Sequence, residues 1–454
     1  MIGKYLHCLV AMMCLLVPLH ADDARVLANP VPVEQLLNGP DRQDIPWKVE
    51  VVQDITLQQR HLVQVLATIR GHDYFKGVWI RDLHVITKVA DQHGNWLDGQ
   101  SCDHFKQPRD LSVQDSVHSF ANLYLKPGDY TIAEIAYDSL HNAVNVWRTK
   151  LTVPAIAVPL PDLSHDLPVV EFLPRSQAAL DLKSADWGLN PPLVLHSLML
   201  DPLTLGHGHA NLPVANKKPL LIDVIVNLSD DIEESGRALG HPYGTLLGVP
   251  GPVACYPNCG YAWLFERENS AAYKYNEGLA LQVGNLVSQL APGTGCVRFS
   301  AMDVLRQDLI ADRVDSSKVD WDAISQKIAS TELNVIDVKA LREKETELRF
   351  RSYLERINED DYACGLSGQK PEHILIVVGI DMSFPLHTEI EPIPATHPNL
   401  RCYYLRMRFK GAPPSWDELN RILKPLHPKR LPFIGAQQLR KQIDFIVKDL
   451  AAAD

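Results

Sequence analysis

The chain has 454 residues, of which 46% are hydrophobic and 22% are charged, and its formal net charge is -11. This composition is typical of globular proteins, and the length is sufficient for two or three hydrophobic cores rather than one. The acidic balance argues against a nucleic-acid partner, because affinity for a phosphate backbone comes mainly from clustered Lys and Arg side chains.

The first 21 residues have the layout of a signal peptide. Lys4 precedes an apolar stretch from residue 6 to residue 19, and Ala21 is followed by two acidic residues. The apolar stretch is too short to span a bilayer, and no later stretch reaches the length of a membrane helix. We therefore expect cleavage after Ala21 and an exported mature protein, periplasmic or extracellular, without a transmembrane helix.

Residues 47–154 carry the alternation of apolar and polar side chains that is typical of β-strands. The alternation is clear in RHLVQVLATIR, in PGDYTIAEIAYD and in VNVWRTKLTVP, and turn residues separate these segments. Short strands at this spacing predict a β-sandwich. The stretch 125–154 resembles the last hairpin of bacterial immunoglobulin-like modules, in which a Pro-Gly turn leads into a strand with an inward-facing Tyr.

Residues 155–218 are rich in Pro, which disfavours both helix interiors and central strands. We interpret this zone as a connector that contributes one or two edge strands at most to a neighbouring domain. His196, His207 and His209 lie in it and could chelate a metal ion. Exposure in a linker is the commoner explanation for such residues, because no Cys or carboxylate stands at a supporting spacing.

From residue 219 to residue 454, apolar strand-like runs alternate with segments of helical spacing. The strand-like runs are LLIDVIVNLS, CVRFSAMDV, HILIVVGIDMSF and CYYLRMRF. LLIDVIVNLS is apolar on both faces, as expected of a strand that helices cover on either side. This order predicts an α/β domain built on a doubly wound, mostly parallel sheet.

One family shares the order of features in residues 287–328, which is a helix, a Pro-Gly turn, a strand with the pair Phe-Ser, a short antiparallel strand and a further helix. Together with the closing segment RILKPLHPKRLPFIGAQQLRKQIDFIVKDL, this stretch resembles the von Willebrand factor type A (vWA) domain. The resemblance is to divergent exported bacterial versions that follow an immunoglobulin-like module, and it covers about half of the chain. It implies the vWA fold more specifically than any one function, since a fold hosts many functions.

The resemblance also implies a metal site after the first strand, where the family carries Asp-x-Ser-x-Ser. This chain has Asn227 in place of the first Asp, Ser229 as the one literal match, and Asp231 in place of the last Ser. Asp381 lies one or two positions beyond the place of a later family Asp. These residues offer the oxygen ligands that Mg²⁺ or Mn²⁺ takes in proteins. The alternative interpretation is a polar strand end that binds no metal.

A long insertion, residues 230–272, follows the first strand at the sheet edge where ligands bind in such folds. Loops of this length without regular structure are uncommon unless they are functional or disordered. Aromatic side chains in the insertion suit a protein-contact surface, or else pack the loop onto its own domain. They are Tyr243, Tyr256, Tyr261, Trp263 and Phe265. Cys255 and Cys259 form the candidate local disulfide, since an exported protein can oxidise its Cys residues.

These observations predict a non-catalytic, adhesion-type protein that binds another protein through a degenerate vWA domain. One alternative is a metal-dependent hydrolase on the same sheet, with Asp231 and Asp381 as carboxylates at the strand ends. The sequence contains neither a Gly-x-Ser-x-Gly nucleophile elbow nor a His-Glu-x-x-His motif, which argues against this alternative. A purely structural envelope protein is the third possibility.

Overall fold

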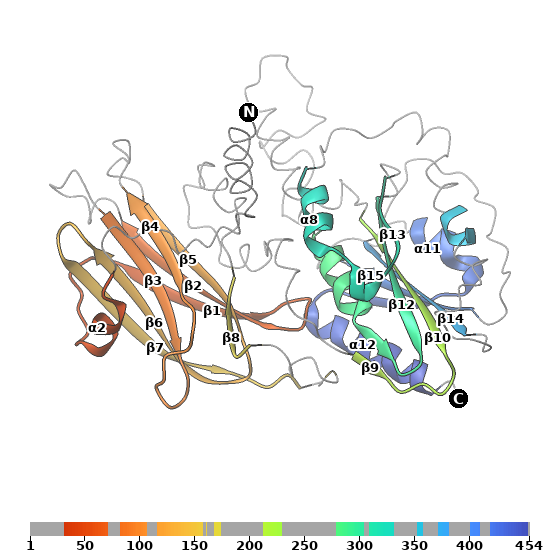
Figure 1. Ribbon diagram of the computed structural model, residues 1–454, viewed down its shortest axis with the longest axis horizontal. Coiled ribbons are helices and arrows are strands. Elements are labelled where there is room, and N and C mark those ends of the chain that lie inside the picture. Colours follow the sequence, from red (N-terminus) through yellow and green to blue (C-terminus); the bar gives the residue numbers. More distant parts are fainter. Residues whose placement is uncertain are drawn as a thin grey trace, which may run out of the picture.

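Figure 1 shows the computed structural model of the chain, in which a strand-rich N-terminal part lies beside a C-terminal part of strands and helices. The predicted signal peptide, most of the connector and the insertion 230–272 lie outside the residues that the structure describes. The described residues are 31–70, 82–106, 116–157, 160, 168–173, 212–228, 278–303, 308–330, 352–356, 371–380, 400–408 and 418–452.

The N-terminal part consists of two four-stranded antiparallel sheets, with orders β1-β2-β5-β8 and β4-β3-β6-β7. Apolar side chains of both sheets meet in one core, for example Val63 and Leu123 with Ile132. This packing confirms the expectation of an all-β N-terminal part. The strands are β1 (Lys48–Ile55), β2 (His61–Arg70), β3 (Asp82–Ala90), β4 (Ser101–Lys106), β5 (Ser116–Leu125), β6 (Gly128–Asp138), β7 (Ala143–Val153) and β8 (Val170–Phe172).

A short helix covers the outer face of the second sheet. This helix, α2 (Val33–Asn38), places Leu37 against Ile86 of β3 and Ile135 of β6. β8 extends the first sheet by pairing with β5, so residues beyond the predicted sandwich contribute to it. Both faces of the second sheet are therefore partly buried, one against the first sheet and one against α2.

The C-terminal part is built on a six-stranded sheet of order β13-β12-β10-β14-β15-β16. Four of its pairings are parallel, and β13 joins β12 antiparallel at one edge. A separate two-stranded parallel ladder joins β9 and β11. The strands are β9 (Leu212–Val214), β10 (Leu220–Asn227), β11 (Leu290–Pro292), β12 (Gly295–Asp303), β13 (Asp308–Asp315), β14 (Glu372–Ile380), β15 (Leu400–Met407) and β16 (Lys429–Phe433).

Every residue of β10 is buried, as its uninterrupted apolar sequence predicts. Its side chains at Ile222, Val224 and Val226 enter the larger core, which includes residues of the helical segment 278–288 and of α12 (Ala436–Ala451). Ile225 points to the other face, into a core that includes Leu419 and Ile422. The remaining labelled helices are α8 (Trp321–Ser330), α11 (Glu418–Leu423), η3 (Ser316–Lys318) and η4 (Lys424–Leu426), and residues 352–356 are also helical.

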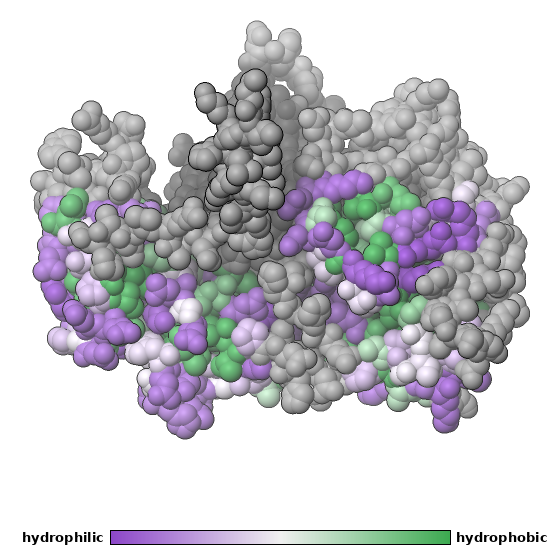
Figure 2. Space-filling view, in the orientation of Figure 1, coloured by the Kyte–Doolittle hydropathy of each residue, from purple (hydrophilic) through white to green (hydrophobic). Residues whose placement is uncertain are grey.

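Strands dominate the described residues, and helices are few. A doubly wound sheet has a helix in each crossover, and the link between β14 and β15, residues 381–399, lies outside the described ranges. No helix within the described ranges is both long and apolar enough to cross a membrane. Figure 2 shows hydrophilic and hydrophobic residues interleaved over the described surface on the side in view.

The turn between β1 and β2 links the sandwich to the C-terminal part. Arg440 on α12 donates from Nε to Gln59 Oε1 over 2.7 Å, and Gln59 Nε2 donates to the Ala436 carbonyl oxygen over 2.9 Å. Both Gln59 and Arg440 are 4% exposed. Leu57 of the same turn packs against the larger core of the C-terminal part. The tip of the β1–β2 hairpin therefore docks on α12.

Substitution Gln59→Ala is expected to weaken this docking, because it leaves the buried Arg440 guanidinium without one of its acceptors. The local cost is about 1–3 kcal/mol. A two-part chain need not unfold in one step, so amide hydrogen exchange of residues 436–451 is the direct measure. Gln53→Ala, an exposed change on β1, is the matched control. Unchanged protection of α12 in Gln59→Ala would show that the contact contributes nothing.

The interior of the sandwich also contains a buried carboxyl group. Thr87 on β3 donates a hydrogen bond of 2.6 Å to Glu134 Oε2 on β6, and Glu134 is 0% exposed. Glu134 Oε1 has no hydrogen-bond partner within the described part of the chain. Burial raises the pKa of Glu134 to about 8, so the folded protein holds this carboxyl mainly protonated at neutral pH.

Stability should therefore fall as pH rises through the interval between the unfolded and folded pKa of Glu134. Below its ordinary value of 4.5 the group is protonated in both states, whereas up to about 8 only the folded state keeps the proton. The loss is at most about 1 kcal/mol per pH unit. Urea titrations from pH 5 to pH 8 should show this decline in the wild type and a flatter profile in Glu134→Gln. Parallel profiles for the two proteins would contradict a protonated Glu134.

Candidate functional site

The carboxyl ends of β10 and β14 meet at the point where the strand order reverses direction along the chain. From β10 the chain adds β12 and β13 on one side, and β14, β15 and β16 on the other. Ligands of open α/β sheets bind outside the strand ends at such a point. Asn227 is the last residue of β10, and Gly379 lies near the end of β14.

Asn227 is 0% exposed, so its amide is not presented to solvent as a ligand at an open rim would be. A Cβ atom on Gly379 would lie 3.5 Å from Asn227 Cβ and 2.9 Å from Leu419 Cδ2. The missing side chain of Gly379 thus allows Asn227 and α11 to pack closely at the switch point. Asn227 belongs to the buried layer between the sheet and α11.

The other predicted site residues lie outside the described ranges. These are Ser229, Asp231 and Asp381 of the predicted metal site, Tyr256, Tyr261, Trp263 and Phe265 of the insertion, and the Cys255–Cys259 pair. Asp303, the last residue of β12, also lies at this edge of the sheet, and it is 2% exposed. Next to it the Leu228 amide donates to the Met302 carbonyl oxygen over 2.8 Å, so β10 and β12 end together.

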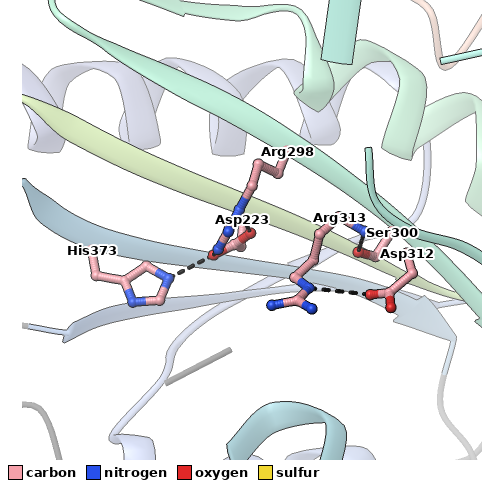
Figure 3. Close-up of polar contacts among 6 residues, drawn as sticks. All are labelled: Asp223, Arg298, Ser300, Asp312, Arg313 and His373. Carbon is pink, nitrogen blue, oxygen red and sulfur yellow. Dashed lines mark hydrogen bonds and ion pairs between the residues drawn. The ribbon is translucent and has the colours of Figure 1, made fainter. Parts of the chain in front are cut away.

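Below this edge, three neighbouring strands place charged side chains on one face of the sheet (Figure 3). Asp223 of β10 lies opposite Arg298 of β12, and His373 of β14 lies opposite Leu221. Arg298 donates to Asp223 Oδ1 from Nε and to Oδ2 from Nη2, both over 2.7 Å. His373 Nε2 lies 2.6 Å from Asp223 Oδ2. The three side chains form a buried ion cluster, with exposed fractions of 2%, 6% and 10% for Asp223, Arg298 and His373.

The chemistry of the cluster favours a structural role. The bidentate guanidinium matches the charge and geometry of the carboxylate, which offsets part of the cost of burying both. An Asp–His pair can also orient a catalytic base. However, among the described residues His373 hydrogen-bonds to Asp223 and to no Ser or Cys side chain. The cluster instead ties three parallel strands together at fixed positions.

A second polar group lies further along the same face, toward the strand ends (Figure 3). Ser300 Oγ accepts a hydrogen bond of 2.9 Å from the Arg313 amide, at a register shift between β12 and β13. Arg313 has a φ of 48°, in the left-handed region that non-glycine residues rarely adopt. Tyr353 is buried near Ser300, but its hydroxyl makes no hydrogen bond within the described residues. Burial raises the pKa of the Tyr353 hydroxyl.

Sequence reasoning from the vWA pattern did not identify Asp223, Arg298 or His373 as partners. A usable signal was present, because each is a charged or titratable residue beside or within an otherwise apolar strand: LLIDVIV, CVRFSAM and EHILIVV. A charge in a buried strand requires a partner, and the opposite signs of Asp223 and Arg298 were compatible with pairing. Their pairing depends on strands that lie 75 residues apart in the sequence.

Comparison with known proteins yields little. No family model matches the chain, and no curated protein matches it. It is similar to a solved structure described as Northeast Structural Genomics Consortium target SoR45, with 14% identity, coverage of 25% of this chain and 89% of that chain, and a TM-score of 0.18. It is also similar to an ApaA protein from Bordetella pertussis, with 9% identity, coverage of 25% and 97%, and a TM-score of 0.15. At these TM-scores neither structure identifies the fold or the function of this chain.

The ion cluster allows a sharp test of its role. Asp223→Asn leaves the Arg298 charge buried without a counter-charge, which should destabilise the protein by about 3–5 kcal/mol. Replacing Asp223, Arg298 and His373 together by Leu, Met and Phe should recover most of that loss. Urea unfolding monitored by circular dichroism measures both effects.

The control is Asp312→Asn, which removes the partly exposed pair of Asp312 with Arg313. This change should cost less than about 1 kcal/mol, because solvent screens such pairs. An Asp223→Asn variant no less stable than Asp312→Asn would refute the structural role of the cluster.

Proposed function

We propose that this chain is an exported, non-catalytic protein that binds another protein through a vWA-type domain attached to an immunoglobulin-like sandwich. The observation that carries the proposal is the strand order of the C-terminal sheet. Numbered by chain order within that sheet, the strands run 3-2-1-4-5-6, the order of doubly wound nucleotide-binding folds, with an antiparallel strand at one edge. The first strand is central and buried on both faces, as the vWA resemblance of residues 287–328 implies.

Export is supported by cysteine chemistry. Cys296, at the start of β12, is disulfide-bonded, whereas Cys102 and Cys402 are free. Since the other Cys residues all lie outside the described ranges, so does the partner of Cys296. Persistent disulfides are typical of oxidising compartments such as the periplasm and the cell exterior. This agrees with the signal-peptide layout of the first 21 residues.

The contact surface that we propose is the insertion 230–272, which leaves the sheet at the carboxyl end of β10. Two versions of the binding mode differ in the role of a metal ion. In one, Mg²⁺ or Mn²⁺ held by Asn227, Ser229, Asp231 and Asp381 binds a carboxylate of the partner. In the other, aromatic side chains of the insertion make the contact. The burial of Asn227 beside Gly379 favours the second version.

The hydrolase alternative has less support. It requires Asp231 and Asp381 to share a metal ion or a proton, and both lie outside the described residues. The buried Asp223–His373 pair does not substitute for them, because the Arg298 guanidinium already neutralises the carboxylate. Protein binding therefore remains the function that this arrangement supports best.

The test captures partners of the mature protein by chemical cross-linking in the native exported fraction, followed by affinity measurement with the purified partner. Tyr261→Ala combined with Trp263→Ala should weaken binding about 30-fold or more, as expected when buried aromatic anchors are removed. Leu140→Ala is the control, because its side chain is 57% exposed in the β6–β7 turn of the sandwich. Equal affinity of the double variant and the control would reject the insertion as the contact surface.

Metal dependence separates the two versions. The aromatic version predicts unchanged partner affinity in the presence of a chelator and no heat signal when Mg²⁺ is titrated into chelator-treated protein. A saturable Mg²⁺ signal that disappears in Asp231→Ala would instead favour the metal version. Recovery of no stoichiometric partner would favour the structural envelope class over both.

A further inference from the structure

A different group of titratable residues lies on β3 and β4, which are neighbouring strands of the sandwich (Figure 1). His84 of β3 stands directly opposite His104 of β4 in the antiparallel register. Asp82 precedes His84 by two residues, so the alternation of a strand places it on the same face. β4 is the edge strand of its sheet, so no further described strand pairs with it beyond β3.

The three side chains converge on one point. His104 Nε2 lies 2.6 Å from Asp82 Oδ1, and His84 Nε2 lies 3.5 Å from Asp82 Oδ2. The two imidazole rings are stacked, with centroids 4.3 Å apart and planes inclined by 8°. One candidate ligand atom from each residue lies within 4.8 Å of the other two.

We propose that Asp82, His84 and His104 form a binding site for a divalent transition-metal ion, of which Zn²⁺ is the reference. Two imidazoles with one carboxylate are a donor set that suits Zn²⁺, Cu²⁺ and Ni²⁺ rather than Mg²⁺ or Ca²⁺, which prefer oxygen ligands alone. Three protein ligands leave a coordination position open for water or for a donor from a ligand. This site does not rest on the proposed function and lies apart from the C-terminal sheet.

The local structure orients the ligands as a metal site requires. Ser139 donates from Oγ to Asp82 Oδ2, and its amide donates to the Asp82 carbonyl oxygen over 3.0 Å. Such hydrogen bonds hold a ligating carboxylate in place. Coordination needs metal–ligand distances of about 2.0–2.2 Å. The candidate ligand atoms lie within 4.8 Å of one another, so side-chain rotations can bring all three to that distance from one ion.

The three side chains differ in their exposure to solvent. The side chain of His84 is 3% exposed and forms the inner wall, whereas those of Asp82 and His104 are 22% and 38% exposed. An ion can therefore enter from solvent past His104 and settle on the fixed His84 ring.

The test is calorimetric titration of Zn²⁺ into the chelator-treated full chain, repeated with Co²⁺ while the visible absorption of the bound cobalt is recorded. His104→Gln and Asp82→Asn should each weaken binding by at least about tenfold and abolish the cobalt bands. Zn²⁺ should also raise the unfolding temperature of the wild type but not of His104→Gln. His93→Gln is the matched control, because His93 is exposed in the turn after β3 and outside the cluster.

Three outcomes would overturn the proposal. They are the absence of saturable Zn²⁺ binding, binding that His104→Gln leaves unchanged, and binding that His93→Gln weakens as much as His104→Gln. Should the variants fail to fold, the wild type still decides the question, because bound Zn²⁺ must protect His104 but not His93 from modification by diethyl pyrocarbonate. Equal modification of His104 with and without Zn²⁺ would reject the site.

Discussion

The strand order and register of the C-terminal sheet depend on the pairing of one buried carboxylate, that of Asp223. Asp223 lies in the middle of β10, where every residue is buried, and an isolated charge there would cost several kcal/mol. Arg298 and His373 satisfy it from the two neighbouring strands. The same contacts select the strand neighbours, since sliding β12 or β14 along β10 would leave a buried charge without its partner. The central strands, and the switch point at their carboxyl ends, are placed by this cluster.

The switch point itself is packed more tightly than the vWA resemblance implies. Asn227, which the vWA resemblance would align with a metal-binding Asp, lies in the buried layer beside Gly379 and α11. A carboxylate in that position would be difficult to bury without a cation, whereas a hydrogen-bonded neutral amide costs much less to bury. Asn227 therefore fits a strand end that packs inside the protein. This favours the insertion, rather than a metal ion at the strand end, as the proposed contact surface.

Within the described residues, the two parts of the chain meet at the tip of the β1–β2 hairpin, through a buried polar contact and the packing of Leu57. Gln59 at the tip of the β1–β2 hairpin bonds both to the guanidinium of Arg440 and to the backbone of α12. Its left-handed φ of 66° is a conformation that a hairpin tip tolerates when tertiary contacts hold it. The proposed metal site of Asp82, His84 and His104 lies on the sandwich, apart from this contact and from the C-terminal sheet.

The sequence by itself determined the local features: strand alternation in the first part, the buried β10, and the division into an all-β part and a part with helices. Periodicity reports which face of a strand is covered, because successive side chains point to opposite faces of the strand. Only the tertiary structure decided that Asp223 meets residues 75 and 150 positions away, and that His84 faces His104. Strand order and register bring these groups together, and the pattern within one strand does not identify which distant strand will lie beside it.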